Sequence, residues 1–210
     1  MPVKDSSFRR RNFLKLFGYG MLGTATASSL LLGCNGCEEK ILKPVVLGFV
    51  DWMAEIPDLI NQYRKANKLP AIKLSSKLSA VALAHVKDLT NYQPEKACGD
   101  KGNLHSWSNH GNWKGVNGNG AWKGCCFPKD FSNSICMWDK PKEIAKYPSE
   151  GYEISTLAYD GKTALSNWKA SSDHNDVILN KGIWTNYTWK ALGGVYLGGY
   201  ACAWFGVTAD

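Results

Sequence analysis

Three widely spaced residues, His105, Glu153 and His174, have side chains suited to metal binding or acid–base chemistry. Two imidazoles and a carboxylate can ligate a divalent cation such as Zn2+ and leave a coordination position for water. Equally, Glu153 can orient and charge one histidine through a hydrogen bond, which raises the pKa of that imidazole. The spacing matches no compact metalloprotease motif such as His-Glu-x-x-His, so a third interpretation is that these residues only support loops.

The remaining candidates for chemistry are weaker. No Gly-x-Ser-x-Gly nucleophile elbow occurs, and no glycine-rich phosphate motif follows a predicted strand. The run from Ser171 to His174 holds the residue types of a catalytic triad, but sequence neighbours do not form one. His85 lies on the apolar stripe of a predicted helix and is expected to be a core histidine bonded to a backbone carbonyl. His110 is expected to be solvated.

Two helices are predicted ahead of these residues. Apolar side chains at helical spacing predict a first helix around residues 56–64, with Pro57 in its first turn. A second helix is expected to begin with Ser75 or Ser76 as its N-cap. Its buried stripe would comprise Leu78, Val81, Ala82, His85 and Leu89.

A third helix and a hairpin are predicted to close the chain. The helix spans about residues 161–171, with Ala164, Leu165 and Trp168 facing inward. Two β-prone runs, 193–197 and 200–205, flank a Gly-Gly pair and predict a tight hairpin. The order of helix, helix, loop, helix and hairpin is an α+β arrangement.

Residues 93–150 differ in composition, because Gly, Asn, Trp, Lys and Cys dominate there. Such a stretch cannot bury a regular apolar face, so we expect a long irregular excursion held by disulfides. Its tryptophans could stack on a glycan, or they could fill a small disulfide-bonded core; these are Trp107, Trp113, Trp122 and Trp138.

The N-terminus has the features of an export signal. Arg10-Arg11-Asn12-Phe13-Leu14-Lys15 has the twin-arginine form, and the apolar run after it is rich in small residues. Leu31-Leu32-Gly33-Cys34 then resembles a bacterial lipobox, in which Cys34 receives the lipid. We therefore expect a signal peptide over 1–33 and a lipid-anchored tether over 34–55, with the folded domain in 56–210.

An exported chain meets an oxidising compartment, where cysteines form disulfides. With Cys34 lipidated, six candidates remain and allow 15 full pairings. Two of the six are adjacent and are expected to pair with other cysteines rather than with each other. The candidates are Cys37, Cys98, Cys125, Cys126, Cys136 and Cys202.

The charge of the chain argues against a nucleic-acid partner. The 210 residues hold 25 Lys and Arg against 18 Asp and Glu, a net charge of +7. Residues 1–33 account for five of the basic groups and one acid, so the rest of the chain carries only +3. A nearly neutral body lacks the dense basic face that phosphate backbones require.

Several short motifs occur in a fixed order along the chain. The segment of the first two helices carries the pattern Leu59-Ile60-Asn61 with Arg64, Leu69-Pro70, Leu74, Leu78, Ala82, His85 and Asp88. It is followed by Gly151-Tyr152-Glu153-Ile154, then by Trp168 with Ser171, His174 and Ile178-Leu179-Asn180, and finally by Gly193-Gly194-Val195 and Trp204-Phe205-Gly206. Together these motifs resemble the CAP superfamily, the SCP/TAPS group of cysteine-rich secretory, antigen-five and pathogenesis-related proteins, and its bacterial branch in particular. The resemblance covers about residues 56–206.

The resemblance implies an α-β-α sandwich with a central antiparallel sheet. It also implies a cleft where His105, as the first cavity histidine, meets His174 and acidic residues that include Glu153. Many eukaryotic relatives have a second glutamate in the helix that carries Trp168, where this chain offers Ser171. The Trp- and Cys-rich insertion at about 107–150 departs from the compact bacterial form and is expected to cover or extend the cleft.

The resulting expectation is an exported, lipid-anchored CAP-domain protein that faces the periplasm or the cell surface. Its cleft, lined by His105, Glu153, His174 and Ser171, would bind a small ligand, lipid, glycan, protein or divalent cation without turnover. Alternatively, a metal-dependent hydrolase would use the same cleft, with Glu153 as base or metal ligand. A third alternative is recognition of cell-wall glycans by the Trp-rich stretch.

Overall fold

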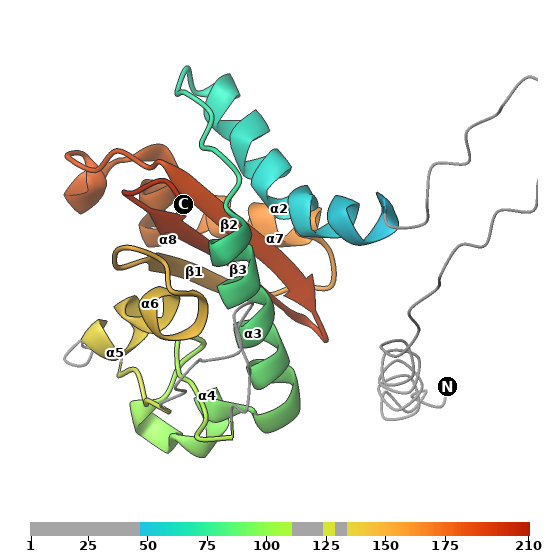
Figure 1. Ribbon diagram of the computed structural model, residues 1–210, viewed down its shortest axis with the longest axis vertical. Coiled ribbons are helices and arrows are strands. Elements are labelled where there is room, and N and C mark those ends of the chain that lie inside the picture. The colour runs from blue at the N-terminus through green and yellow to red at the C-terminus, as the bar shows by residue number, and fades with distance from the viewer. Residues whose placement is uncertain (1–46, 111–123, 129–133) are drawn as a thin grey trace, which may run out of the picture. The chain divides into compact units, whose positions relative to one another are not determined.

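A three-stranded antiparallel sheet forms the centre of the domain (Figure 1). Its strands are β1 (Tyr152–Leu157), β2 (Ala191–Leu197) and β3 (Tyr200–Gly206). The computed structural model describes residues 47–110, 124–128 and 134–210. Within this part of the chain the strand order is β1-β3-β2, so β3 is central and β1 lies at an edge.

The predicted closing hairpin is confirmed. β2 and β3 pair in antiparallel register, with Leu197 opposite Tyr200. Gly198 and Gly199 form the turn with φ angles of 62° and 92°, a conformation that favours glycine. β1 pairs with the other side of β3 and places Glu153 opposite Trp204.

Helices cover both faces of the sheet, which confirms the predicted α-β-α sandwich (Figure 1). Side chains of β3 alternate between two cores: Trp204 packs with α3, while Phe205 packs with the opposite helices. One layer comprises α3 (Ser76–Tyr92) and α6 (Lys140–Ala145). The other comprises α2 (Leu47–Ala66), α7 (Gly161–Ala170) and α8 (Ser172–Leu179).

Helix α3 lies directly against the sheet. Ser75 is its N-cap and accepts a hydrogen bond from the Leu78 amide at 3.0 Å, as predicted. The whole predicted stripe, including His85, is buried. At Gly193 of β2 a Cβ would lie 2.2 Å from the Ser79 amide nitrogen, so only glycine permits this close contact.

The first helix differs from its prediction at the N-terminal end. α2 begins at Leu47, within the stretch predicted as a tether, and Pro57 therefore lies inside it rather than in its first turn. The apolar face that surrounds the proline is well packed, because Ile56 and Ile60 are both buried. The helix ends at Ala66, and Lys68 then takes a positive φ of 62°.

The excursion between α3 and β1 contains short helices within its described residues. They are α4 (Pro94–Ala97), α5 (Ser134–Trp138), α6 and the 3-10 turn η1 (Gly99–Lys101). A second 3-10 turn, η2 (Gly182–Trp184), follows α8. Disulfides join Cys98 to Cys126 and Cys125 to Cys136, so the adjacent cysteines pair with other partners as predicted.

Cys202 forms no disulfide in the described part of the chain, so its prediction as a disulfide cysteine was wrong. It is a free, buried thiol on the central strand β3. Its Sγ donates to the Ala82 carbonyl at 3.5 Å, and α3 covers it. The sulfur lies within 4.8 Å of ligand atoms of His85 and Glu153.

Several predicted features lie outside the described residues. These are the signal peptide 1–33, the lipidation site Cys34, Cys37, and the tryptophans Trp113 and Trp122. Within the described chain, no helix has the length and apolar character that crossing a membrane requires.

Candidate functional site

The carboxylate of Glu153 binds two histidines, one with each oxygen. Glu153 lies on β1 and points toward α3, from which His85 Nδ1 contacts its Oε1 directly. His105 comes from the loop after η1, and its Nδ1 lies 2.8 Å from Glu153 Oε2. The structure thus joins His105 and Glu153, which are far apart in the sequence, and adds His85 as a third member.

The environment keeps Glu153 ionised. Burial alone raises the pKa of this fully buried carboxyl, but the charges and hydrogen bonds of His85 and His105 outweigh that effect. The pKa of Glu153 consequently falls from 4.5 to about 2. An ionised carboxylate only accepts hydrogen bonds, so the Nδ1 atoms of both histidines must carry protons.

The two histidines differ in what their other nitrogen contacts. His85 Nε2 lies 3.1 Å from the Ser106 carbonyl, which is also only an acceptor, so both nitrogens of His85 donate. This confirms the predicted bond from a core histidine to a backbone carbonyl. Among the described residues, Nε2 of His105 has no hydrogen-bond partner, and the side chain of His105 remains 16% exposed. His105 therefore presents Nε2 at the solvent-reachable end of the cluster, where the neutral form of the ring would offer a lone pair.

Helix α3 also fixes the loop that carries His105. Asp88 lies one turn after His85 and is buried. Its carboxylate accepts from the Ser108 amide at 2.8 Å and from the Ser108 hydroxyl. Within the loop, Asn103 Oδ1 accepts the His105 amide at 2.9 Å. Residues on both sides of His105 are thereby held in place.

His174 lies close enough to the cluster to respond to its charges. It belongs to the first turn of α8 and is half-buried. Burial lowers its pKa most, and the charge of His105 lowers it further, against the opposing effects of Asp173 and Glu153. His174 is therefore neutral at physiological pH. Ser171 is the N-cap residue of α8, next to this turn, but its side chain makes no capping hydrogen bond.

Two imidazoles at or near the cluster, those of His105 and His174, have nitrogen atoms of the kind that Zn2+ accepts when the rings are neutral. A second group, His85, Glu153 and Cys202, has ligand atoms within 4.8 Å of one another. There, however, His85 and Glu153 are in direct hydrogen-bond contact and all three are buried, so an ion between them would have to break that pair.

The sequence did not single out the role of His85. Its place on an apolar stripe indicates a core residue, and nothing local predicts that a carboxylate from a distant strand reaches it. The available signal was its spacing to Asp88, because two polar side chains three residues apart on a buried helix face require partners. His110 is exposed as expected, and its ring stacks on Tyr92 with centroids 4.7 Å apart.

The fold and the site together define a class: an α-β-α sandwich in which a buried glutamate joins two histidines beside an edge strand. The sequence profile of CAP, the cysteine-rich secretory protein family, matches residues 58–189. The chain belongs to this family, as its sequence motifs predicted.

Three solved structures are similar to the chain. An extracellular protein with an SCP domain from Bacillus anthracis shares 19% identity over 74% of this chain and 40% of its own, with a TM-score of 0.46. A cysteine-rich secretory protein from Staphylococcus aureus shares 16% identity over 76% of this chain and 39% of its own, with a TM-score of 0.45. An outer surface protein from Borrelia burgdorferi shares 14% identity over 72% of this chain and 88% of its own, with a TM-score of 0.43.

This chain thus spans about two fifths of the length of the first two structures. No curated protein matches the chain.

Proposed function

We propose that this CAP domain binds a divalent cation or a small ligand at His105 and His174 without turning it over. The observation that carries the proposal is the hydrogen bond from His105 Nδ1 to Glu153, which leaves Nε2 directed away from the buried cluster and free to ligate a cation in the neutral form of the ring. The low pKa of His174 supports it, because a neutral imidazole is the form that ligates a metal.

Glu153 is assigned the role of a positioning residue and not of a metal ligand. Both of its oxygens already accept hydrogen bonds from imidazoles. A carboxylate that accepts from the Nδ1 of a ligating histidine fixes the tautomer and the orientation of the ring. A cation held by His105 and His174 would supply positive charge to attract an anionic or carbonyl group of a ligand. The hydrolytic alternative assigns Glu153 a direct role, and this distinguishes the two hypotheses.

The location of the protein is part of the proposal. The twin-arginine pattern at Arg10-Arg11 and the lipobox that ends at Cys34 support export and lipid anchoring. The two disulfides of the excursion support an oxidising compartment. A membrane is therefore the partner proposed for Cys34, and the binding site would face the periplasm or the cell surface.

The test is titration of the metal-free protein with Zn2+ by calorimetry, together with metal analysis of protein purified without chelator. We expect saturable binding that is lost in His105→Ala and in His174→Ala. His110→Ala is the matched control, because His110 is exposed and outside the cluster. Absence of binding to the native protein would overturn the metal part, and equal loss in His110→Ala would indicate nonspecific surface binding.

A further inference from the structure

The loop that carries His105 is attached to the segment 124–128 by backbone hydrogen bonds. Trp107 and Cys125 exchange two such bonds, of 2.8 and 2.9 Å. The Phe127 amide donates to Ser106 Oγ at 3.0 Å, and the Phe127 ring meets the His105 ring edge-on with centroids 5.2 Å apart. The position of His105 therefore depends on where this segment lies.

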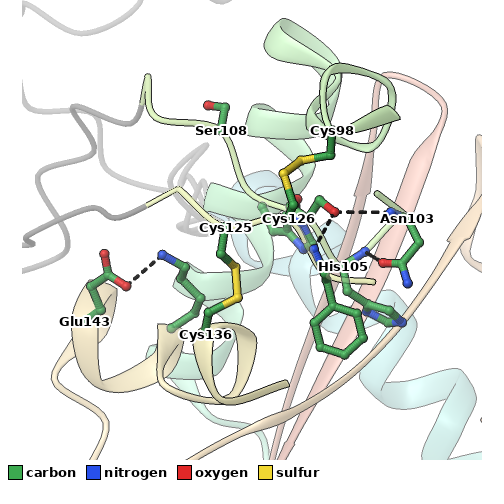
Figure 2. Close-up of a disulfide and its surroundings, with 12 residues drawn as sticks. Cys98, Asn103, His105, Ser108, Cys125, Cys126, Cys136 and Glu143 are labelled. Atoms are coloured by element: carbon green, nitrogen blue, oxygen red, sulfur yellow. Dashed lines mark hydrogen bonds and ion pairs between the residues drawn. A yellow bond between two sulfur atoms is a disulfide. The ribbon is translucent and has the colours of Figure 1, made fainter. Parts of the chain in front are cut away.

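Two disulfides hold the segment through neighbouring residues (Figure 2). Cys126 joins Cys98, which ends α4 and precedes the turn that leads to His105. That turn is tight, because a Cβ at Gly102 would lie 2.7 Å from the Cβ of Cys98. Cys125 joins Cys136 on α5 instead. Only the first of these two bonds links the segment to the chain that enters the His105 loop.

The Cys98–Cys126 bond lies nearer the surface than the contacts that it supports. Cys126 is exposed and Cys98 is half-buried. By contrast, Ser106 and Phe127, the residues through which the segment holds the His105 loop, are fully buried. Since accessible disulfides are the ones that exchange most readily, reduction can begin while the core is still folded.

We infer that the Cys98–Cys126 disulfide is a positioning element for His105, so that reducing it weakens the bond between His105 and Glu153. The inference rests on the proposed function, since it concerns the same site and makes its binding depend on the redox state. Reduction by a dithiol breaks the S–S bond, yields two cysteine thiols and converts the dithiol into its own disulfide. The Phe127 amide is then no longer held against Ser106 Oγ.

The experiment observes His105 directly and needs no bound metal. Long-range proton–nitrogen NMR of protein labelled in its histidines reports which ring nitrogen is protonated and how fast that proton exchanges. In the oxidised protein we expect His105 to carry its proton on Nδ1. In Cys98→Ala/Cys126→Ala, Nδ1 should share the proton with Nε2, and its exchange with water should be at least about tenfold faster.

Two comparisons isolate the disulfide. Cys125→Ala/Cys136→Ala should keep the native His105 signal. In this variant a phosphine reductant should still change that signal by breaking the Cys98–Cys126 bond. The phosphine takes up the oxygen of one water, and the two hydrogens of that water complete the thiols. Ser106→Ala keeps both disulfides and should shift His105 as the first double variant does. This second route also applies if that double variant does not fold.

An unchanged His105 signal in folded Cys98→Ala/Cys126→Ala, or in Ser106→Ala, would overturn the inference. Failure of the proposed function gives a different result. In that case Zn2+ does not bind even to the oxidised protein, while the His105 signal still responds to the loss of the disulfide.

Discussion

The imidazole of His85 stacks on the indole of Trp107, with ring centroids 4.0 Å apart and ring planes 7° apart. Both side chains are buried, and the ammonium of Lys140 lies 5.3 Å from the centroid of the indole ring. Trp107 belongs to the tryptophans considered for glycan stacking, but here it fills the core between α3 and α6. The indole ring therefore holds the imidazole of His85 in the orientation that faces Glu153.

Replacing Trp107 tests whether the stacked indole stabilises the protein. Trp107→Ala removes a fully buried indole and is expected to lower the free energy of unfolding by about 3–5 kcal/mol. Trp107→Phe keeps an aromatic face against His85 and should cost clearly less. Urea denaturation followed by circular dichroism measures both. Equal losses in the two variants would show that the stacked face contributes nothing beyond its volume.

Replacing Glu153 with glutamine removes the charge but preserves the shape. One end of the amide would then point N–H groups at an N–H of a histidine, so we expect a loss of about 3–5 kcal/mol in unfolding free energy. Glu150→Gln is the control, because the side chain of Glu150 is 45% exposed and its contact with Lys142 lies on the surface. That change should cost less than about 1 kcal/mol.

The same variant separates the two hypotheses on function. With a positioning role for Glu153, Glu153→Gln should weaken Zn2+ binding by about 10–100-fold without abolishing it. The hydrolytic alternative requires steady turnover of peptide, ester or glycan substrates by the native protein, and its loss in Glu153→Gln. Turnover that depends on Glu153 would replace binding as the function.

Acid should destabilise the native protein through Glu153. The pKa of this carboxyl is lowered from 4.5 to about 2, so the unfolded chain takes up the proton first as the pH falls. The stabilisation, roughly 3 kcal/mol, is present above pH 4.5 and is lost as the pH falls toward 2. Denaturation measured from pH 6 to about 2 should show this loss, and Glu153→Gln should lack it.

His174 is predicted to resist protonation. Its pKa is lowered from 6.5, chiefly by burial, so at pH 6.5 it should be less than half protonated. Folding stability from this group falls below pH 6.5, because the unfolded state binds the proton first. NMR titration should show His174 protonating at a lower pH in native protein than in denatured protein. A native midpoint at or above the denatured one would contradict the prediction.

Arg64 connects α2 to the end of the helix that carries His174. Its Nη1 donates to the Ile178 carbonyl and to Asn180 Oδ1, while its Nε donates to the Pro70 carbonyl at 3.0 Å. Lysine cannot reproduce this planar arrangement, so Arg64→Lys should lower the unfolding free energy by about 1–3 kcal/mol. Lys65→Ala, an exposed position in the same turn, should change it little. Similar losses in both variants would refute this role.

The local elements could be predicted because their causes are local. The cap at Ser75, the stripe that contains His85 and the glycine pair between β2 and β3 each follow from a few neighbouring residues. The start of α2 was missed because Pro57 resembles a helix N-terminus, whereas the helix extends back to Leu47.

The site itself was only partly predictable. His105, Glu153 and His174 came together through the resemblance to a family, and spacing alone did not require it. The Glu153–His85 contact depends on which face of β1 turns toward α3, and that is decided by the register between β1 and β3. That Cys202 remains a free thiol could not be predicted for the same reason, because it follows from the buried position of this residue on the central strand.

The absence of a side chain at Gly193 has a consequence for a residue on another element. The backbone of α3 contacts the backbone of β2 at this position, so the helix packs closer to the sheet than any side chain at position 193 would permit. His85 belongs to that helix, and the close packing lets its imidazole reach the carboxylate of Glu153. A methyl group at position 193 would push α3 away from the sheet. Glu153 would then remain buried without its hydrogen bond from His85.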